Sequence, residues 1–279
     1  MMKNSNRRIG LFDSGVGGLT VLREMYRQMP TESLLYFADS ARLPYGTRSA
    51  SEILQFVREI LDWMCSQDVK MIIMACNTSS ALALEIVRKE YDLPILGVIL
   101  SGARAAVTRG KRIGVIATNA TVNSHAYLQA IQEINPQTQV WEIACPEFVY
   151  LIEQNQLYTD YTRQVARQYL RPLIKKQIDT LIYGCTHYRH LDKTIRDQLP
   201  TSVEIIDPAE HIAAAAEKEL SLLGLRNDRF SLPTQFYVSG SVEQFASLSQ
   251  QWLGHYPQVK QIKTSIARST QVMALNPKN

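Results

Sequence analysis

Short apolar runs rich in branched residues alternate along the chain with longer stretches whose apolar side chains recur every three or four positions. The first pattern predicts buried strands, and the second predicts helices that pack against them. This alternation is typical of parallel sheets covered by helices. The predicted strands are 8–12, 34–38, 70–75, 95–99, 112–117, 139–144, 180–184, 203–206 and 235–238, with 259–264 as a candidate edge strand.

The stretches with helical periodicity include 49–66, 79–91 and 209–223. The last of these follows Asp207 and Pro208, which form a natural N-cap with proline at the first helical position. A chain of 279 residues is long enough for one large α/β domain or for two small ones.

Two segments of the first half of the chain are echoed in the second half. The run RIGLFDSGVGG from Arg8 is answered by RIGVIATNATV from Arg112, an offset of 112 − 8 = 104. The run MIIMACNTSSAL around Cys76 is answered by TLIYGCTHYRHL around Cys185, an offset of 185 − 76 = 109. Because both pairs occur in the same order with nearly equal offsets, we interpret the chain as a duplicated α/β half.

Cys76 and Cys185 each stand directly after a predicted strand and before a predicted helix. Reactive groups gather at the carboxyl ends of parallel strands, so two facing halves would bring both thiols to one cleft. A helix N-terminus lowers the pKa of a thiol from its usual value of about 8.5, which favours a thiolate. One thiolate could then take a proton from carbon while the opposite thiol delivers one. The alternative is that both are buried structural cysteines.

Polar residues beside the two cysteines suit a small anionic ligand. Asn77 and Thr78 follow the first cysteine, and Thr186 and His187 follow the second. Free backbone N–H groups and hydroxyls at the start of a helix bind anionic oxygens. The two threonines could instead act only as N-caps, a role that is compatible with ligand binding.

The segment DSGVGG at 13–18 follows the first predicted strand. Its glycines permit a tight turn and a close approach of the backbone to a ligand. Their spacing is not the G-x-G-x-x-G pattern of dinucleotide sites. Asp13 would repel a phosphate, so a small molecule with an ammonium group is the better guest.

Composition excludes several classes of protein. The 30 basic and 26 acidic residues give a net charge of +4 and are scattered, so we expect no nucleic-acid partner. The four cysteines form no C-x-x-C pair, which argues against a disulfide framework and a zinc ribbon. The N-terminus is polar, and no apolar run reaches the roughly 18 residues of a membrane span. We therefore expect a cytoplasmic protein that does not enter membranes.

Several segments, in family order, resemble the glutamate racemases of the aspartate/glutamate racemase superfamily. They cover roughly the first 190 residues, and a short match at 207–210 extends the resemblance. The segments are DSGVGGLTV (13–21), ADSARLPYG (38–46), ACNTSS (75–80), GVIATNATVNSHAY (114–127), ACPEFVYLIE (144–153), GCTHY (184–188) and DPAE (207–210).

The resemblance implies an α/β fold of two pseudo-symmetric, doubly wound domains with mainly parallel sheets and the active site at their interface. The first domain would comprise residues 1–97 and 209–279 and carry Cys76. The second would comprise residues 98–208 and carry Cys185.

The resemblance also implies an activity, the interconversion of L- and D-glutamate without cofactor or metal. The product D-glutamate would serve peptidoglycan synthesis, cell-wall biogenesis and cell shape, and the enzyme would be a homodimer. Cys76 would act on D-glutamate with support from Asp13, and Cys185 on L-glutamate with support from Glu153 and His187. The implied substrate-binding residues are Asp13, Ser14, Tyr45, Gly46, Asn77, Thr78, Thr186 and His187.

Three positions depart from the family pattern. Leu100-Ser101 replaces a pair that usually ends in proline, and Tyr150 and Arg189 each stand where proline is usual. These departures bear on interdomain geometry and regulation, because none of them removes an implied catalytic group.

Three alternatives remain open. An aspartate racemase, or a racemase of another small acid, would keep both cysteines. A non-catalytic amino-acid-binding or regulatory protein would not need them. A metal site from Cys76, Cys185 and His187 is a third alternative, although C-x-H is an unusual ligand spacing.

Overall fold

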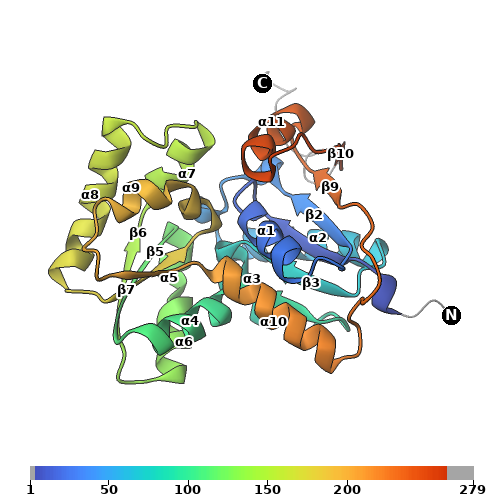
Figure 1. Cartoon of the computed structure of the whole chain (residues 1–279), viewed down its shortest axis with the longest axis horizontal. Coiled ribbons are helices and arrows are strands. Elements are labelled where there is room, and N and C mark those ends of the chain that lie inside the picture. Colours follow the sequence, from blue (N-terminus) through green and yellow to red (C-terminus); the bar gives the residue numbers. More distant parts are fainter. Residues whose placement is uncertain (1–3, 263–279) are drawn as a thin grey trace, which may run out of the picture.

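The computed structural model describes residues 4–262, which form two parallel sheets with helices packed against them (Figure 1). The strand order is β10-β9-β2-β1-β3-β4 in the larger sheet and β6-β5-β7-β8 in the smaller. The larger sheet contains β1 (Ile9–Asp13), β2 (Leu34–Ala38), β3 (Met71–Met74), β4 (Ile95–Gly97), β9 (Gln235–Val238) and β10 (Val259–Gln261). The smaller contains β5 (Arg112–Ala117), β6 (Gln139–Ala144), β7 (Thr180–Gly184) and β8 (Glu204–Ile206).

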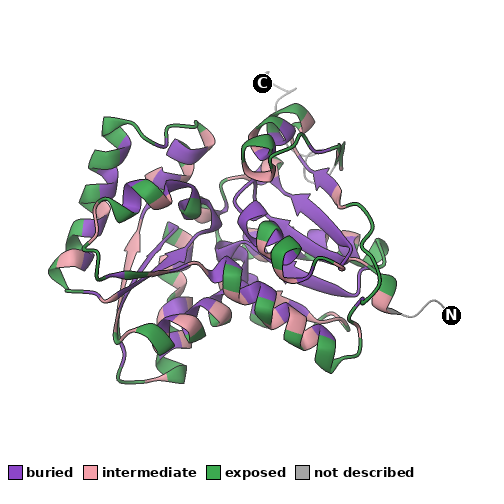
Figure 2. Ribbon diagram, in the orientation of Figure 1, coloured by how far each residue is buried: buried purple, intermediate pink, exposed green. Residues whose placement is uncertain are grey.

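The helices connect the strands and cover the sheets. Buried residues fill most of the strands, whereas β6 and β10 consist of half-buried and exposed residues, and the helices turn an exposed face outward (Figure 2). The α-helices are α1 (Leu19–Gln28), α2 (Ala50–Ser66), α3 (Asn77–Val87), α4 (Val98–Arg109), α5 (Asn119–Ser124), α6 (Ala126–Ile134), α7 (Pro146–Glu153), α8 (Asp160–Lys175), α9 (Asp192–Arg196), α10 (Pro208–Leu222) and α11 (Val242–Leu253). The 3-10 helices are η1 (Asn4–Asn6), η2 (Ser40–Arg42), η3 (Tyr45–Thr47) and η4 (Thr186–Leu191).

The order of strands supports the duplication inferred from the sequence. The run β2-β1-β3-β4 of the first half has the same order as β6-β5-β7-β8 of the second half. In both halves the first strand is central and the third lies directly beside it. The carboxyl ends of β3 and β7, which lead into the two cysteines, are therefore equivalent points of the two halves.

Two helices cross from one half of the molecule to the other (Figure 1). Each follows a strand of one half and packs on the other half. Helix α4 follows β4 but packs on α6 and β7, and α10 follows β8 but packs on α1. Ala103 and Ala106 of α4 belong to the core of the smaller sheet, and Ala213 and Ala216 of α10 to that of the larger. The two helices also pack against each other. This exchange supports one domain boundary between residues 97 and 98 and another between residues 208 and 209. We propose these two boundaries.

Most predicted elements have the observed bounds or differ by one or two residues. The predicted strand 95–99 is too long, because Val98 and Ile99 begin α4. The predicted helix 79–91 begins earlier, at Asn77, and ends at Val87. Ser49 caps α2 in a capping box with Glu52, as its sequence favours. The end of the candidate edge strand at 259–264 lies outside the described residues.

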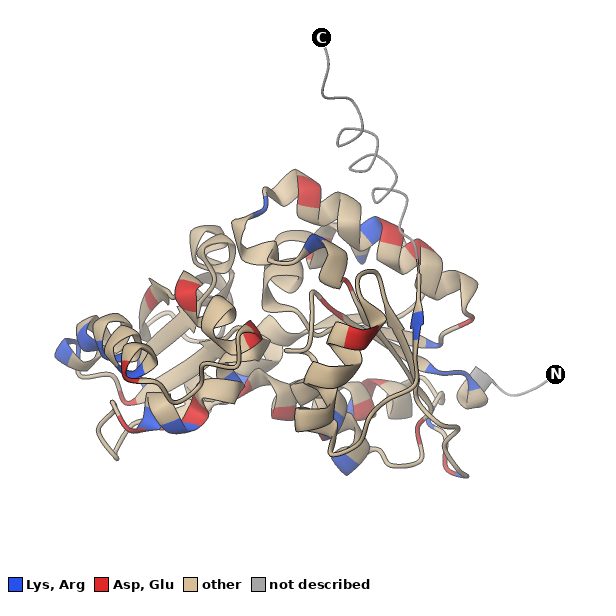
Figure 3. Ribbon diagram, turned by 90° about the horizontal axis from the view of Figure 1, so that it is seen from above, with Lys and Arg blue, Asp and Glu red and all other residues tan. Residues whose placement is uncertain are grey.

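Charged positions of both signs are distributed over the two halves (Figure 3). The prediction that the chain binds no nucleic acid stays a prediction. Within residues 4–262, no helix is long and apolar enough to cross a bilayer.

Candidate active site

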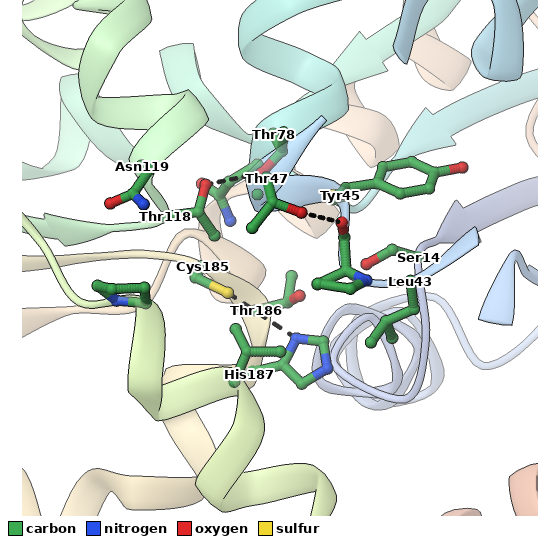
Figure 4. A pocket seen from close by; sticks show the side chains of 16 residues that line it. Ser14, Leu43, Tyr45, Thr47, Thr78, Thr118, Asn119, Cys185, Thr186 and His187 are labelled. Atoms are coloured by element: carbon green, nitrogen blue, oxygen red, sulfur yellow. Dashed lines mark hydrogen bonds between the residues drawn. The ribbon is translucent and has the colours of Figure 1, made fainter. Parts of the chain in front are cut away.

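A cavity lies between the two halves of the molecule (Figure 4). Both halves contribute to the wall, and both Cys76 and Cys185 belong to it. The lining residues are Ser14, Leu43, Pro44, Tyr45, Gly46, Thr47, Cys76, Asn77, Thr78, Thr118, Asn119, Pro146, Val149, Cys185, Thr186 and His187.

Cys76 precedes the first residue of α3 and is only 6% exposed. Burial raises the pKa of its thiol to about 12, and the nearby Asp13 carboxylate adds to this rise. The N–H of Ser79 at the start of the helix opposes the rise but does not cancel it. The expectation that a helix N-terminus brings this thiol toward neutrality is therefore wrong for Cys76, because desolvation outweighs the helix.

Cys185 has a different environment at the equivalent point. Its sulfur lies 3.8 Å from Nδ1 of His187 (Figure 4). Nε2 of the same ring lies 2.8 Å from Oε1 of Glu153. Burial alone would lower the pKa of His187, but the contacts with Cys185 and Glu153 raise it well above its usual value. The geometry thus favours an imidazolium beside the Cys185 sulfur, held by a carboxylate on its far side.

Asp13 connects the two halves. It ends β1, is fully buried, and accepts hydrogen bonds from the N–H of Gly15 at 2.8 Å and the hydroxyl of Thr186 at 3.0 Å. Burial raises the pKa of Asp13, while His187 and these donors counteract part of the rise. The glycine-rich turn permits this contact, because a Cβ on Gly17 would lie 2.4 Å from the Thr186 hydroxyl oxygen.

The predicted substrate-binding residues lie in the cavity wall, with the exception of Asp13, which lies behind Thr186. Glu153 also lies outside the wall, behind His187. The hydroxyl of Tyr45 donates to Asp39, and its ring points away from the cavity (Figure 4). The catalytic and binding roles of all these residues remain predictions.

The sequence analysis missed several lining residues, among them Thr118, Asn119 and Val149. The repeat offset could have revealed Thr118, because 118 − 14 = 104 makes it the counterpart of Ser14. The Thr118 hydroxyl lies 2.9 Å from that of Thr78, so this pair bridges the halves (Figure 4). Val149 has no comparable signal, because it is one apolar residue of an amphipathic helix.

The metal-site alternative has no structural support. Among residues 4–262, no group of three or more histidine, cysteine or acidic side chains is arranged to hold a metal ion. The expectation that the chain needs no metal stays a prediction.

Comparison with known proteins agrees with this architecture. The model of the Asp/Glu/Hydantoin racemase family matches residues 9–216. A glutamate racemase of Gloeothece citriformis is 67% identical over 254 residues, which cover 91% of each chain. The chain belongs to the glutamate racemase family.

Solved racemases share the fold over almost their whole length. A glutamate racemase isoform of Bacillus anthracis has a TM-score of 0.90 at 38% identity, covering 93% of this chain and 98% of its own. A glutamate racemase of Francisella tularensis, solved in complex with D-glutamate, has a TM-score of 0.88 at 35% identity, with coverages of 95% and 99%. The resemblance and the two-domain α/β fold predicted from the sequence are thus confirmed, and the racemase is an isomerase.

The departures from the family pattern lie outside the cavity wall. Tyr150 is 64% exposed on α7, and Ser101 is half-buried on α4. Arg189 forms ion pairs with Asp192 at 3.5 Å and Asp207 at 3.7 Å. None of the three therefore alters the lining of the cavity.

Proposed function

We propose that this racemase interconverts L- and D-glutamate by a two-thiol mechanism without a cofactor, and so supplies D-glutamate for peptidoglycan. The observation that carries the proposal is that two thiols, one from each half, line one cavity. The relatives named as glutamate racemases support glutamate as the substrate, and one of them holds D-glutamate.

The unlike surroundings of the thiols support a division of labour. An imidazolium 3.8 Å from Cys185 stabilises negative charge on its sulfur, whereas the pKa of about 12 keeps Cys76 protonated at neutral pH. The form that acts on L-glutamate pairs a thiolate at Cys185 with a thiol at Cys76. The Cys185 thiolate takes the α-proton on one face, and the Cys76 thiol delivers its own proton to the other face.

This turnover leaves the protons reversed, with a thiol at Cys185 and a thiolate at Cys76. That form is the one that acts on D-glutamate, and proton exchange with solvent converts it back to the form that acts on L-glutamate. Asp13 opposes the thiolate at Cys76, and an ammonium group bound near Asp13 would offset this effect.

Other groups around the cavity are suited to bind the substrate and to stabilise the charge that develops during the reaction. Backbone N–H groups at the starts of α3 and η4 are suited to bind carboxylate oxygens, and the hydroxyls of Ser14, Thr78 and Thr118 line the same space. Preorganised donors in a buried site stabilise charge that develops in the transition state. We further propose, as the sequence leads us to expect, a cytoplasmic homodimer that binds neither nucleic acid nor membrane.

The decisive experiment runs L-glutamate with the purified chain in heavy water, without added cofactor, and stops the reaction early. The D-glutamate formed should carry deuterium at Cα, and the remaining L-glutamate should carry little, because separate groups serve the two faces. The reaction from D-glutamate should give the mirror result. Early deuterium in the starting enantiomer, or turnover of aspartate in place of glutamate, would contradict the proposal.

A further inference from the structure

Residues 43–47 form one wall of the cavity, with five consecutive lining residues. This segment, the substrate loop, contains only the short helix η3. A loop with so few backbone hydrogen bonds of its own depends on side chains to fix its shape. The side chains that fix it lie outside the cavity, in the part of the ADSARLPYG segment to which the family resemblance assigns no role.

Asp39 lies directly after β2 and is fully buried. One of its oxygens pairs with Nε of Arg42 at 2.6 Å and accepts the hydroxyl hydrogen of Tyr45. Its other oxygen accepts from the hydroxyl of Ser239, just after β9, at 2.7 Å. Asp39 therefore contacts the residue before the substrate loop, a residue within it, and a neighbouring strand end.

Arg42 extends this network to α2. Its side chain is 6% exposed, and its Nη1 lies 2.6 Å from Oε2 of Glu59. Its guanidinium lies 4.3 Å from the centre of the Phe56 ring, on which the Tyr45 ring also packs. Buried charges that are paired in this way resist displacement, because moving one partner leaves the other uncompensated.

The substrate loop also meets the opposite half of the molecule. A Cβ on Gly46 would lie 2.6 Å from Cβ of Thr118, so the two backbones are as close as a glycine allows. Thr118 in turn contacts the Thr78 hydroxyl at 2.9 Å. A small shift of the loop would therefore change both the cavity wall and the contact between the halves.

We propose that Asp39, acting through Arg42 and Tyr45, is a positioning residue that holds the substrate loop in its binding shape and so sets the affinity for glutamate. This inference rests on the proposed function. Asp39 and Arg42 do not line the cavity, so they act only through the loop.

The variant Tyr45→Phe tests the inference, because it removes the hydroxyl on Asp39 and keeps the ring that packs on Phe56. We expect KM for both enantiomers to rise about 5- to 20-fold, with kcat within about threefold, as for a loss of uniform binding. The rise must lower kcat/KM equally in both directions, because enantiomers have equal free energies. Ser239→Ala, which loses the bond to the other Asp39 oxygen, should raise KM about 2- to 5-fold.

Tyr91→Phe is the matched control, because Tyr91 donates its hydroxyl to Asp62 at 2.7 Å, away from the loop. It should leave KM unchanged. A Tyr45→Phe protein with a lower melting temperature and an unchanged KM would overturn the inference, and so would a fall in kcat alone.

Calorimetric titration with L-glutamate separates this inference from the proposed function. If the wild type binds glutamate but does not racemise it, the proposed function fails. The positioning role of Asp39 is then judged by whether Tyr45→Phe raises Kd about 5- to 20-fold, and an unchanged Kd refutes it.

Discussion

Cys76 and Cys185 follow equivalent strands, β3 and β7, each of which lies beside the central strand of its half. The helical segments that come after the two cysteines differ. Cys76 precedes the 11-residue helix α3, whereas Cys185 precedes the six-residue 3-10 helix η4. His187 of η4 places its Nδ1 at 3.8 Å from the Cys185 sulfur, and α3 has no histidine at the equivalent point.

The charges beside the two sulfurs are opposite in sign. A carboxylate, Asp13, adds to the raised pKa of Cys76, and an imidazolium held by Glu153 lies beside Cys185. The duplicated fold thus places a thiol at the equivalent strand end of each half, and the neighbouring charged residues make the two thiols chemically different. In many enzymes, different environments move the pKa values of two titratable groups apart, so that one group acts as the acid and the other as the base.

The strongest test of this comparison removes each thiol in turn. Cys76→Ala and Cys185→Ala should each lower kcat by at least about 10²–10⁴-fold, because each removes the acid or base of one face. Circular dichroism should remain native. Cys145→Ala is the control, because Cys145 is a buried free cysteine outside the cavity wall. A single active-site variant with near-normal turnover would refute the two-thiol assignment.

A second variant tests whether the Cys185 side depends on the charge held by Glu153. Glu153→Gln weakens the 2.8 Å contact with His187, and we expect kcat/KM to fall about 10- to 100-fold. With α-deuterated substrate, the isotope effect should rise from L-glutamate and shrink from D-glutamate, since proton transfer at Cys185 becomes more limiting.

Glu147→Gln is the control on the same helix, because the Glu147 carboxylate accepts hydrogen bonds from Tyr161 and Tyr169, which do not line the cavity. It should leave both isotope effects unchanged. Equal changes from both enantiomers in Glu153→Gln would mean that Glu153 supports the site as a whole and not the Cys185 side.

The sequence predicted the elements well because their signals are local. Buried strands and amphipathic helices have periodicities that survive in any context. Local periodicity does not show the exchange of α4 and α10 between the halves. It was expected only from the family resemblance, whose domain bounds separate each of these helices from the strand before it. Val98 and Ile99 continue an apolar run, and such a run fits a buried strand as well as the first turn of a buried helix.

The site was predictable where a rule connects position to chemistry. Both cysteines and their polar neighbours follow strand ends, which is where parallel sheets carry their ligands. The direction of the Cys76 pKa was not predictable, because it depends on how much structure buries the sulfur. The network around Asp39 was also hidden, since the partners Glu59 and Ser239 lie up to 200 positions away.

The two exchanged helices, α4 and α10, begin with different residues. We expect a substitution at the start of α10 to have the smallest effect on activity. Helix α4 begins after Gly97, whereas α10 begins after Asp207, whose side chain accepts from the N–H of Ala209 and is 11% exposed. Burial raises the pKa of Asp207 from 3.8 to about 6. Between these values the folded chain binds more protons than the unfolded chain, so the free energy of unfolding falls as pH rises and is level above pH 6.

Asp207→Asn removes this titration and keeps a good N-cap. Relative to the wild type, the variant should gain stability between about pH 4 and pH 6, by at most about 3 kcal/mol, and hold that gain at higher pH. The residual exposure and the pair with Arg189 at 3.7 Å reduce the gain. Urea unfolding at pH 4.5 and 7.5 measures it. A gain that is the same at both pH values would mean that the carboxylate of Asp207 is not what distinguishes the start of α10 from the start of α4.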